Sequence, residues 1–373
     1  MNTVIIKKCK EYDAEKIKEQ VLAGLDEAGG LDSIIKPGEK VLLKVNSLTQ
    51  APPETAVNTH PEFLRAIIRI IKTKTDRVFV GDSPAFTLRF SFASRGNKMG
   101  KVIREEGAEL VDFTESQGVV NESALAYKNL EISSLVKSMD KVISLPKLKT
   151  HTLTYMTLAV KNMYGIVPGG AKVGFHLKAG RDRELFSKTV IDIYNTRPPD
   201  FTIMDGIYGL EGNGPSSDGD PVNTGVIVMG KDGFGIDHAV CRITGVDPDK
   251  VTTLSVYRKF VLKGGEIEYI IKGEEIEGVF HKIKTPGEDV KSSIPGFLYN
   301  FAKDLFVRKP LFRKRRCTGC LACVKHCPVN ALKYKKRRKI VCDYKACIRC
   351  FVCLEVCEDK AVTVSRPLFS LFK

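Results

Sequence analysis

The C-terminal part of the chain carries one cysteine pattern twice, and this repeat limits what the region can fold into. Both copies read Cys-x2-Cys-x2-Cys-x3-Cys and start 30 residues apart, at Cys317, Cys320, Cys323 and Cys327 and at Cys347, Cys350, Cys353 and Cys357. Three thiolates at this spacing can wrap one iron–sulfur cluster, while the fourth cysteine of the run reaches a neighbouring cluster. Because so short a segment buries too little apolar surface to fold alone, we expect the clusters to hold it together.

The repeat resembles the bacterial-type ferredoxin module that carries two [4Fe–4S] clusters. The resemblance implies one cluster held by Cys317, Cys320, Cys323 and Cys357, and a second held by Cys347, Cys350, Cys353 and Cys327. Glu358 stands where the second copy would repeat Pro328 of the first, which changes a turn and no ligand. We therefore expect a small α+β ferredoxin-like domain at the C-terminus.

Other uses of these cysteines fit less well. No apolar run approaches the roughly 20 residues of a membrane span, and the first residues lack the apolar stretch of a secretory signal, so we expect a cytoplasmic protein. Disulfides are disfavoured in that reducing compartment, and structural zinc prefers two cysteine pairs with a longer spacer. Cys342 lies outside the repeat, and we expect it to be a buried packing thiol rather than a redox group.

The net charge of +15 belongs almost entirely to the same region. Residues 301–373 hold 19 Lys and Arg against 5 Asp and Glu, an excess of 14, so residues 1–300 are nearly neutral. Two anionic clusters would offset about 4 of these charges. The basic runs 313–316 and 335–339 then have three interpretations: a solvated face, a docking surface for an acidic redox partner, or a nucleic-acid site. The last is the least favoured, because no RNA- or DNA-binding motif accompanies the charge.

Residues 1–285 alternate short apolar runs with helix-like segments. The predicted strands are 3–8, 40–45, 77–81, 109–113, 141–145, 201–204 and 225–229, and the predicted helices are 14–28, 61–72, 98–106, 153–164, 182–195 and 235–244. Continuous Val/Ile/Leu runs are typical of strands buried on both faces. We therefore predict an α/β fold with an open, mostly parallel sheet and helices on both faces.

Familiar cofactor motifs are missing from this body. No G-x-G-x-x-G follows the first predicted strand, which argues against a standard dinucleotide site. The run from Gly165 to Lys172 approaches a phosphate-binding loop, but Ala171 stands where lysine belongs, so we reject it as a Walker motif.

Polar residues gather instead where the predicted strands end. Ligands of open α/β sheets bind beyond the carboxyl ends of the strands, so we expect these residues to converge on one crevice. The candidates for substrate binding are Lys44, Asn46, His60, Asp82, Ser83, Lys161, Asn162, Asp205 and Gly206, and the candidates for catalysis are Lys147, Lys149 and His151, with His176 as a further possibility.

Lys147, Lys149 and His151 are separated by one residue each. In an extended segment their side chains would therefore lie on one face. Such a face favours a small anionic substrate, and His151 could supply a proton because imidazole titrates near neutrality. Asp82, Asp205 and His60 could bind a metal or orient the lysines. The alternative is structural, since Asp-Ser and Asp-Gly are common turn residues and His60 precedes a predicted helix.

Residues 40–250 resemble the domain-of-unknown-function 362 family, whose members often carry a C-terminal two-cluster ferredoxin. The resemblance rests on Lys44-Val-Asn46, Gly81-Asp82-Ser83-Pro84, Leu145-Pro146-Lys147-x-Lys149-Thr150-His151, Lys161-Asn162-x-x-Gly165 and Asp205-Gly206. It implies an iron–sulfur protein of anaerobic-type metabolism and supplies no settled reaction.

We therefore expect a body at 1–285, a linker at 286–312, a two-cluster ferredoxin domain at 313–366 and a tail at 367–373. An apolar stripe from Phe297 to Phe306 lies in the linker, where it could pack on the body or touch a membrane surface. The leading functional hypothesis is an iron–sulfur oxidoreductase that relays low-potential electrons to or from an anionic substrate. The alternatives are a non-enzymatic electron carrier or redox assembly module and, third, a nucleic-acid-binding protein.

Overall fold

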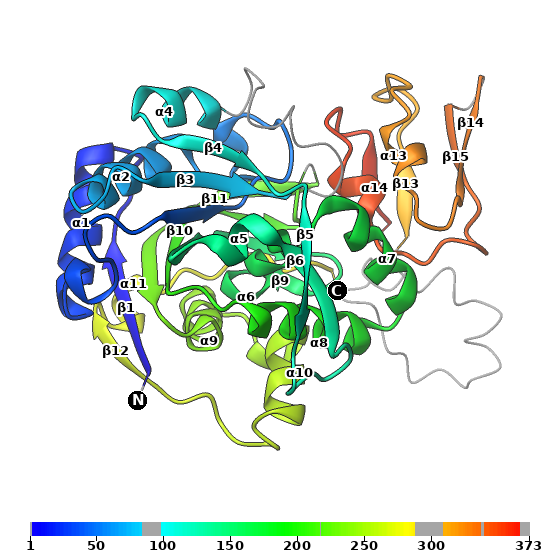
Figure 1. Cartoon of the computed structure of the whole chain (residues 1–373). Coiled ribbons are helices and arrows are strands. Elements are labelled where there is room, and N and C mark those ends of the chain that lie inside the picture. The colour runs from blue at the N-terminus through cyan, green and yellow to red at the C-terminus, as the bar shows by residue number, and fades with distance from the viewer. Residues whose placement is uncertain (1, 84–97, 217, 288–308, 337–338, 366–373) are drawn as a thin grey trace.

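A ten-stranded mixed sheet forms the centre of the body in a computed structural model that describes residues 2–83, 98–216, 218–287, 309–336 and 339–365 (Figure 1). The strands run in the order β12-β1-β11-β10-β7-β2-β3-β4, with β8 and β9 branching from β10. Their bounds are β1 Asn2–Lys8, β2 Val41–Val45, β3 Val78–Asp82, β4 Glu109–Asp112, β7 Lys141–Leu145, β8 Lys147–His151, β9 Tyr155–Thr157, β10 Phe201–Gly212, β11 Gly219–Gly230 and β12 Tyr269–Gly273.

The half of the sheet that carries the polar strand ends is parallel. β10, β7, β2, β3 and β4 are neighbours in that order, and each of these pairs is parallel. β11 is antiparallel to both β1 and β10, and β9 is antiparallel to β8. All five residues of β2 are buried, as expected of a strand covered on both faces. The prediction of a mostly parallel α/β sheet is confirmed.

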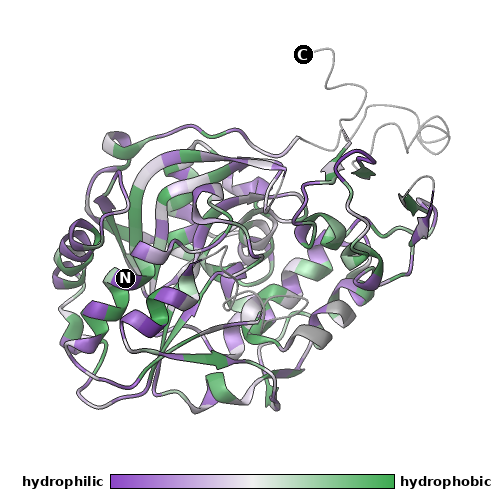
Figure 2. Ribbon diagram, turned by 90° about the horizontal axis from the view of Figure 1, so that it is seen from above, coloured by the Kyte–Doolittle hydropathy of each residue, from purple (hydrophilic) through white to green (hydrophobic). Residues whose placement is uncertain are grey.

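Helices cover the sheet on both faces. One layer contains α1 (Ala14–Glu27), α2 (Pro61–Lys72) and α4 (Met99–Glu105), and the other contains α5 (Ser134–Ser138), α6 (Ala159–Asn162), α7 (Gly169–Ala179), α8 (Arg183–Thr196), α9 (Gly233–Thr244), α10 (Thr252–Phe260) and α11 (Ile276–Val279). Each layer has its own apolar core against the sheet, centred on residues such as Phe63 in the first and Phe186 in the second. In Figure 2 the helices alternate green and purple segments, as expected of elements with one buried face.

Short elements complete the body. They are the 3₁₀ turns η1 (Leu31–Ser33), η2 (Pro53–Thr55), η3 (Met163–Ile166) and η4 (Pro248–Lys250), and a two-stranded antiparallel sheet of β5 (Ser116–Val120) and β6 (Asn129–Ser133).

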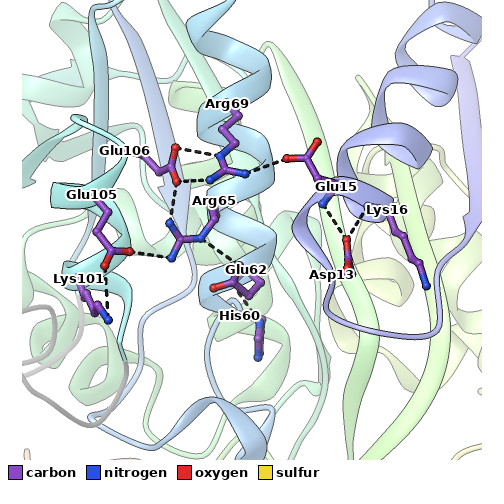
Figure 3. Close-up of polar contacts among 10 residues, drawn as sticks. All are labelled: Asp13, Glu15, Lys16, His60, Glu62, Arg65, Arg69, Lys101, Glu105 and Glu106. Atoms are coloured by element: carbon purple, nitrogen blue, oxygen red, sulfur yellow. Dashed lines mark hydrogen bonds and ion pairs between the residues drawn. The ribbon is translucent and has the colours of Figure 1, made fainter.

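Ion pairs connect the outer surfaces of the first helix layer (Figure 3). Arg65 of α2 reaches Glu105 at 2.8 Å and Glu106 at 2.7 Å, and Arg69 reaches Glu106 at 2.9 Å and Glu15 of α1 at 2.8 Å. Because surface pairs of this kind contribute about 0–1 kcal/mol each, the apolar contacts beneath them carry most of the stability. The network mainly fixes how α1, α2 and α4 lie side by side.

One predicted helix is wrong in its first half. Residues 153–164 were expected to form a single helix, but β9 occupies Tyr155–Thr157 and only Ala159–Asn162 is α-helical. Tyr155 adopts a left-handed backbone conformation with φ of 70° where the chain turns back from β8. The apolar residues at helical spacing are instead buried in the core from the turn and strand that pair with β8.

The cysteine region forms a small α+β unit at one end of the body (Figure 1). It contains two antiparallel pairs, β13 (Pro310–Phe312) with β16 (Val362–Val364) and β14 (Leu332–Lys335) with β15 (Lys339–Cys342), and the short helices α13 (Ala322–Lys325) and α14 (Val352–Glu355). β13 lies within the segment predicted as a linker, whereas the apolar stripe at 297–306 lies outside the described residues.

Hydrogen bonds attach this unit to the body. The Arg181 guanidinium donates to the Cys347 carbonyl at 2.9 Å, and the Ser216 hydroxyl donates to the Leu354 carbonyl at 3.1 Å. The backbone N–H of Val364 donates to Asp218 Oδ2 at 3.0 Å. The placement of the cysteine unit is therefore specified by polar contacts on several of its segments. Across the part of the chain that the structure describes, no helix is long and apolar enough to cross a bilayer.

Replacement of a core phenylalanine should separate packing from surface effects. Phe63 of α2 is fully buried, whereas the side chain of Phe280 is 53% exposed. We expect Phe63→Ala to lower the free energy of unfolding by about 3–5 kcal/mol because it leaves a cavity, and Phe280→Ala to lower it by about 1 kcal/mol or less. Denaturant titration of both variants measures this, and similar losses would contradict the assigned core.

Candidate functional site

A cavity of about 80 Å³ lies between the carboxyl ends of the parallel strands and the cysteine unit. Cationic and imidazole side chains dominate its wall. The lining residues are Lys44, Asn46, Ser47, Leu48, Asp82, Ser83, Lys149, His151, Thr157, Lys161, Asn162, Tyr164, Gly165, Lys172, His176, Pro215 and Glu355. They come from β2, β3, β8, β9, α6, η3 and α7 of the body, from the loops that follow β2, β3 and β10, and from α14 of the cysteine unit. A cavity is thus present at the strand ends, and Glu355 of the cysteine unit forms part of its wall.

One buried ion pair forms the floor of this cavity. Lys44 Nζ lies 2.9 Å from Asp82 Oδ1, and both side chains are almost fully buried. Asp82 also accepts the backbone N–H groups of Ser47 at 2.7 Å and Ser83 at 2.8 Å. Burial lowers the pKa of Lys44, while Asp82 opposes that shift. The pair is thus held by hydrogen bonds on its anionic side, which a buried ion pair needs to be tolerated.

Gly165 leaves the room that this pair requires. A Cβ at position 165 would lie 2.2 Å from Asp82 Oδ1 and 2.4 Å from Lys44 Nζ, closer than real side chains approach. The glycine is therefore needed for close approach rather than for an unusual backbone angle.

An amide network extends from Lys44 to a second lysine. The Lys44 ammonium donates to Asn162 Oδ1 at 3.0 Å, Asn46 Nδ2 donates to the same oxygen at 3.3 Å, and the Lys149 ammonium donates to Asn46 Oδ1 at 2.7 Å. Asn162 is oriented in turn by Ser144, whose hydroxyl oxygen accepts from Asn162 Nδ2 at 2.9 Å. The two asparagines thus place the lysine ammonium groups at fixed positions on the wall.

Three lysines of the wall have no carboxylate within ion-pair distance among the described residues. Lys149 and Lys172 donate to the carbonyls of Val57 and Ser83, respectively, and no contact of this kind fixes Lys161. Burial lowers the pKa of Lys149 to about 7, with repulsion from Lys161 adding to the effect, and burial lowers the pKa of Lys172 to about 7 as well. Burial also lowers the pKa of Lys161. Such a group of ammonium sites is costly to charge without an anion nearby.

His151 presents a hydrogen-bond donor to the cavity. Its Nδ1 accepts the backbone N–H of Leu153 at 3.0 Å, so in neutral imidazole the proton is on Nε2. Nε2 is buried without a hydrogen-bond partner among the residues that the structure describes, and its distance of 3.5 Å to Glu355 Oε1 exceeds a normal hydrogen bond. Burial, with repulsion from Lys161, lowers the pKa of His151 to about 3. The near-neutral titration that suggested a proton donor is therefore absent, and His151 acts as a neutral N–H donor.

A second unpartnered polar atom faces the same space. The Ser83 hydroxyl oxygen is buried without a hydrogen-bond partner among the described residues. Buried polar atoms are normally satisfied, so two such atoms on one cavity wall indicate that a polar ligand or ordered water completes them.

Glu355 is the contribution of the cysteine unit to this wall. It lies in α14 between Cys353 and Cys357 and is buried against the lysines of the body. Burial alone would raise its pKa, but the neighbouring His151 and the Lys161 charge lower it to about 2. Glu355 is therefore a carboxylate at neutral pH, and it supplies an anion to a site that has an excess of cations.

Four of the residues expected in the crevice lie outside the cavity: Lys147, His60, Asp205 and Gly206. The Lys147 ammonium is 2.9 Å from Asp205 Oδ2 and also donates to the Tyr12 hydroxyl at 2.5 Å. His60 caps α2 and stacks on the Tyr12 ring at 3.5 Å between ring centres. The Lys147 ammonium thus binds Asp205 and Tyr12, outside the cavity.

The metal site considered for Asp82, Asp205 and His60 is not formed. Asp82 pairs with Lys44 and Asp205 with Lys147, and across the described ranges no three His, Cys, Asp or Glu side chains converge to hold a single ion. The carboxylates neutralise lysines instead.

Sequence reasoning did not assign Lys172, Tyr164 or Glu355 to the site. Lys172 and Gly165 belong to the run rejected as a Walker motif, and both line the cavity although they form no phosphate loop of that kind. The His176 ring stacks on Phe186 at 4.7 Å, with a pKa that burial lowers to about 4. Glu355 could be noticed only as a carboxylate inside a cysteine motif, which by itself gives no position in space.

The first cysteine set surrounds a common void. Its lining includes Cys317, Cys320, Cys323 and Cys357 together with apolar side chains such as Phe312 and Val362. Cys323 is electrostatically coupled to the other three, and burial raises its pKa to about 12. Four thiols around one apolar-walled space fit a [4Fe–4S] cluster, which binds thiolates in such surroundings.

The second set gathers in the same way. Burial raises the pKa of Cys353 well above its usual value, and Cys350, Cys347 and Cys327, together with Cys323 of the first set, lie close enough to raise it further. The fourth cysteines of the two runs accept equivalent hydrogen bonds, from Ala331 N–H to Cys327 Sγ and from Ala361 N–H to Cys357 Sγ, each at 3.2 Å. The assignment of individual cysteines to two ligand sets stays a prediction that follows from the ferredoxin resemblance.

Cys342 lies beside the second set rather than deep in the core. It is partly exposed, and a hydrogen bond links its thiol to Cys347, raising the pKa of Cys342 and lowering that of Cys347 to about 6. Hydrogen bonds to ligand sulfurs are among the features that set cluster potentials, so Cys342 has a place next to the redox site.

Comparison with known proteins agrees with this division. Residues 41–242 match the domain of unknown function DUF362, and residues 309–358 match the 4Fe-4S dicluster domain. The chain belongs to the DUF362 family. It is 30% identical over 262 residues to a thylakoid-associated protein of Synechocystis sp.. The aligned region covers 70% of this chain and 80% of that protein. In this DUF362 protein the dicluster domain supplies the cysteine unit.

Two solved structures resemble parts of this DUF362 chain. The lactate racemase apoprotein of Thermoanaerobacterium thermosaccharolyticum aligns with a TM-score of 0.39 and 14% identity, over 63% of this chain and 56% of its own. A Thermotoga maritima protein from structural genomics aligns with a TM-score of 0.41 and 14% identity, over 71% of this chain and 62% of its own.

A single added methyl group should disrupt the cavity floor. We expect Gly165→Ala to lower the free energy of unfolding by about 1–3 kcal/mol, because the Lys44–Asp82 pair must move. Gly174→Ala is the matched control, since a Cβ on that residue of α7 meets nothing within 4 Å and should be neutral or stabilising by up to about 1 kcal/mol. Denaturant titration compares them, and equal stability of the two variants would contradict the close approach.

Anion affinity should depend on pH with a defined sign. Sulfate keeps its charge above pH 5, so changes in its affinity report on the protein. Because the pKa values of Lys149 and Lys172 are about 7, both are charged below pH 7, and affinity should fall above pH 7 by up to about tenfold per unit for each lysine. Calorimetric titration from pH 5.5 to 9 measures this.

The Lys149→Met/Lys172→Met double variant serves as the control for that titration. It should bind sulfate weakly and with little pH dependence. An affinity for the unmodified chain that stays constant or rises from pH 6 to pH 9 would contradict the assignment.

Proposed function

We propose that this DUF362 protein is an iron–sulfur oxidoreductase that exchanges single electrons with a small anionic molecule in the lysine-lined cavity. The observation that carries the proposal is the position of Glu355. This residue belongs to the second cysteine motif, yet its carboxylate forms part of the cavity wall. The substrate site and the redox unit therefore share one wall.

Charge and size support an anion of few atoms as the substrate. Lys44, Lys149, Lys161 and Lys172 face the cavity against the carboxylates of Asp82 and Glu355. A water needs about 10–15 Å³ of such volume, so a cavity of about 80 Å³ accommodates roughly five to eight waters or one small anion. A phosphate, a carboxylate or the anionic end of a larger molecule meets both requirements.

The wall residues have distinct tasks in this proposal. Lys149, Lys161 and Lys172 bind the anion and neutralise the charge that accumulates when an electron arrives. His151 donates its Nε2 proton in a hydrogen bond, and the Ser83 hydroxyl accepts or donates a second one. Lys149 and Lys172, with pKa values near 7, are suited to exchange a proton with the reduced product.

The redox unit supplies the electrons. When bound, the [4Fe–4S] clusters provide low-potential one-electron chemistry. Cys350 of the second set is close enough to Glu355 and Tyr164 for mutual electrostatic effects on their pKa values. This proximity supports the set of Cys347, Cys350, Cys353 and Cys327 as the one that serves the cavity.

We also propose a cytoplasmic setting. All of the cysteines are free in the structure, and a reducing compartment keeps such thiols available for clusters. The Synechocystis relative is named as a thylakoid-associated protein.

The proposal predicts more electron uptake than the clusters alone account for. The full chain, purified without oxygen together with its bound anion, should consume more than about two electron equivalents, since each [4Fe–4S] cluster accepts one. The Lys149→Met/Lys161→Met variant should lose the anion and consume about two. Reductive titration followed by absorbance, with mass spectrometry of the released small molecules, measures both quantities.

A matched control tests the location of the effect. Lys188→Met removes a lysine of α8 that pairs with Glu184 outside the cavity, and this variant should behave like the unmodified chain. Uptake of about two equivalents by every variant, with no anion released from any of them, would overturn the oxidoreductase proposal and favour an electron carrier.

A further inference from the structure

The two cysteine sets differ in their access to solvent. In the second set Cys347, Cys350 and Cys353 are buried, and Glu355, which lies in the same motif, lines the cavity. In the first set Cys320 is exposed. Electron transfer between proteins requires a redox group close to the surface, so the unit has an outer end at Cys320 and an inner end at the cavity.

Basic residues border this outer end. Arg313, Lys314, Arg315 and Arg316 are all exposed and form the turn that runs from β13 directly into Cys317. The backbone N–H groups of Arg316 and Cys317 both donate to the Arg313 carbonyl at 3.1 Å, so the turn is an ordered structure. Within the described residues, no ion pair engages any of these four side chains. Their charge is therefore available to a partner.

A second basic segment, at the end of β14, lies beside the first cysteine motif. A Cβ at Gly319 would be 3.6 Å from the Tyr334 ring of β14, which places that strand beside the residue preceding Cys320. The Tyr334 side chain is 50% exposed, and the exposed Lys335 and Lys336 follow it. Exposed tyrosine and arginine are the residue types that most often anchor protein–protein interfaces.

Acidic residues near the outer end are fewer. Glu358 and Asp359 are exposed, and Asp359 accepts a hydrogen bond from the Thr318 hydroxyl. They leave a strong positive excess around Cys320. We call the surface formed by Arg313–Arg316, Tyr334, Lys335 and Lys336 the basic rim.

We propose that the basic rim docks an acidic electron-transfer protein, which exchanges electrons with this chain through the cluster at Cys320. An iron–sulfur or flavin protein with carboxylates around its redox group has the charge that complements the basic rim. Binding there would bring its redox group close to Cys320. Complementary charge raises association rates by about 10–10³-fold at low salt. The inference does not depend on which molecule occupies the cavity.

The exchange is balanced in single electrons. A cluster held by Cys317, Cys320, Cys323 and Cys357 would take up the one electron that the reduced partner loses, and would pass it on to a cluster held by the second set. No bond is formed and no proton is required.

The test uses the full chain with its clusters and an acidic plant-type [2Fe–2S] ferredoxin as the probe. Arg315→Glu/Arg316→Glu should weaken binding of the oxidised ferredoxin at least tenfold in calorimetry. The same variant should slow stopped-flow reduction by the reduced ferredoxin at least tenfold. For the unmodified chain both quantities should fall as salt increases. Reduction by the cationic methyl viologen radical should not slow in the variant.

A control variant carries the same charge change elsewhere. Lys10→Glu/Lys137→Glu replaces two exposed lysines of the body and should leave ferredoxin binding within about twofold, as expected of distant screened charges. Equal binding and equal reduction rates for the two double variants would overturn the proposal. A loss of affinity for a single-stranded RNA or for anionic vesicles, with ferredoxin binding unchanged, would overturn it in favour of those partners.

Discussion

The structure depends on how buried ammonium groups are neutralised. Lys44 has a carboxylate partner within the body, Asp82 at 2.9 Å, but among the described residues Lys149 and Lys172 are held by neutral oxygens alone. An unpaired buried charge is strongly unfavourable, and Glu355 of the cysteine unit brings a further carboxylate to the wall. The packing of the cysteine unit against the body therefore also brings a negative charge to the lysines of the cavity.

This arrangement gives the cysteine unit two different ends. Its inner end, with Cys350 and Glu355, is buried against the body, and its outer end exposes Cys320 beside a basic turn. An electron route between a protein partner and a small molecule requires both features. The body and the cysteine unit are therefore best understood as one functional assembly rather than as two independent domains.

Much of the candidate site follows from residues at strand ends. Lys44, Asp82, Lys149 and His151 were expected together because parallel strands end at one edge of the sheet, and all four line the cavity. Lys147 shares their strand face, yet Asp205 and Tyr12 bind its ammonium in a neighbouring network. Alternation along a strand predicts the face of the sheet on which a side chain lies. It does not predict which group binds the charged end of that side chain.

The expected chemistry of His151 changed for a related reason. Imidazole titrates near neutrality in water, but burial beside Lys161 lowers the pKa of His151 to about 3. Sequence alone contains no information about the solvent that surrounds a side chain after folding. The same limit applies to Lys149 and Lys172, whose lowered pKa values also result from burial.

The α/β architecture, the two cysteine sets and the charge of the C-terminal region follow from the sequence, since apolar periodicity, ligand spacing and composition are local properties. The tertiary structure decided that Glu355 enters the lysine cavity, that Lys172 joins it, and that Cys320 faces solvent. These outcomes require contacts between segments far apart in the chain. Such contacts depend on how the two units pack, which no local pattern contains.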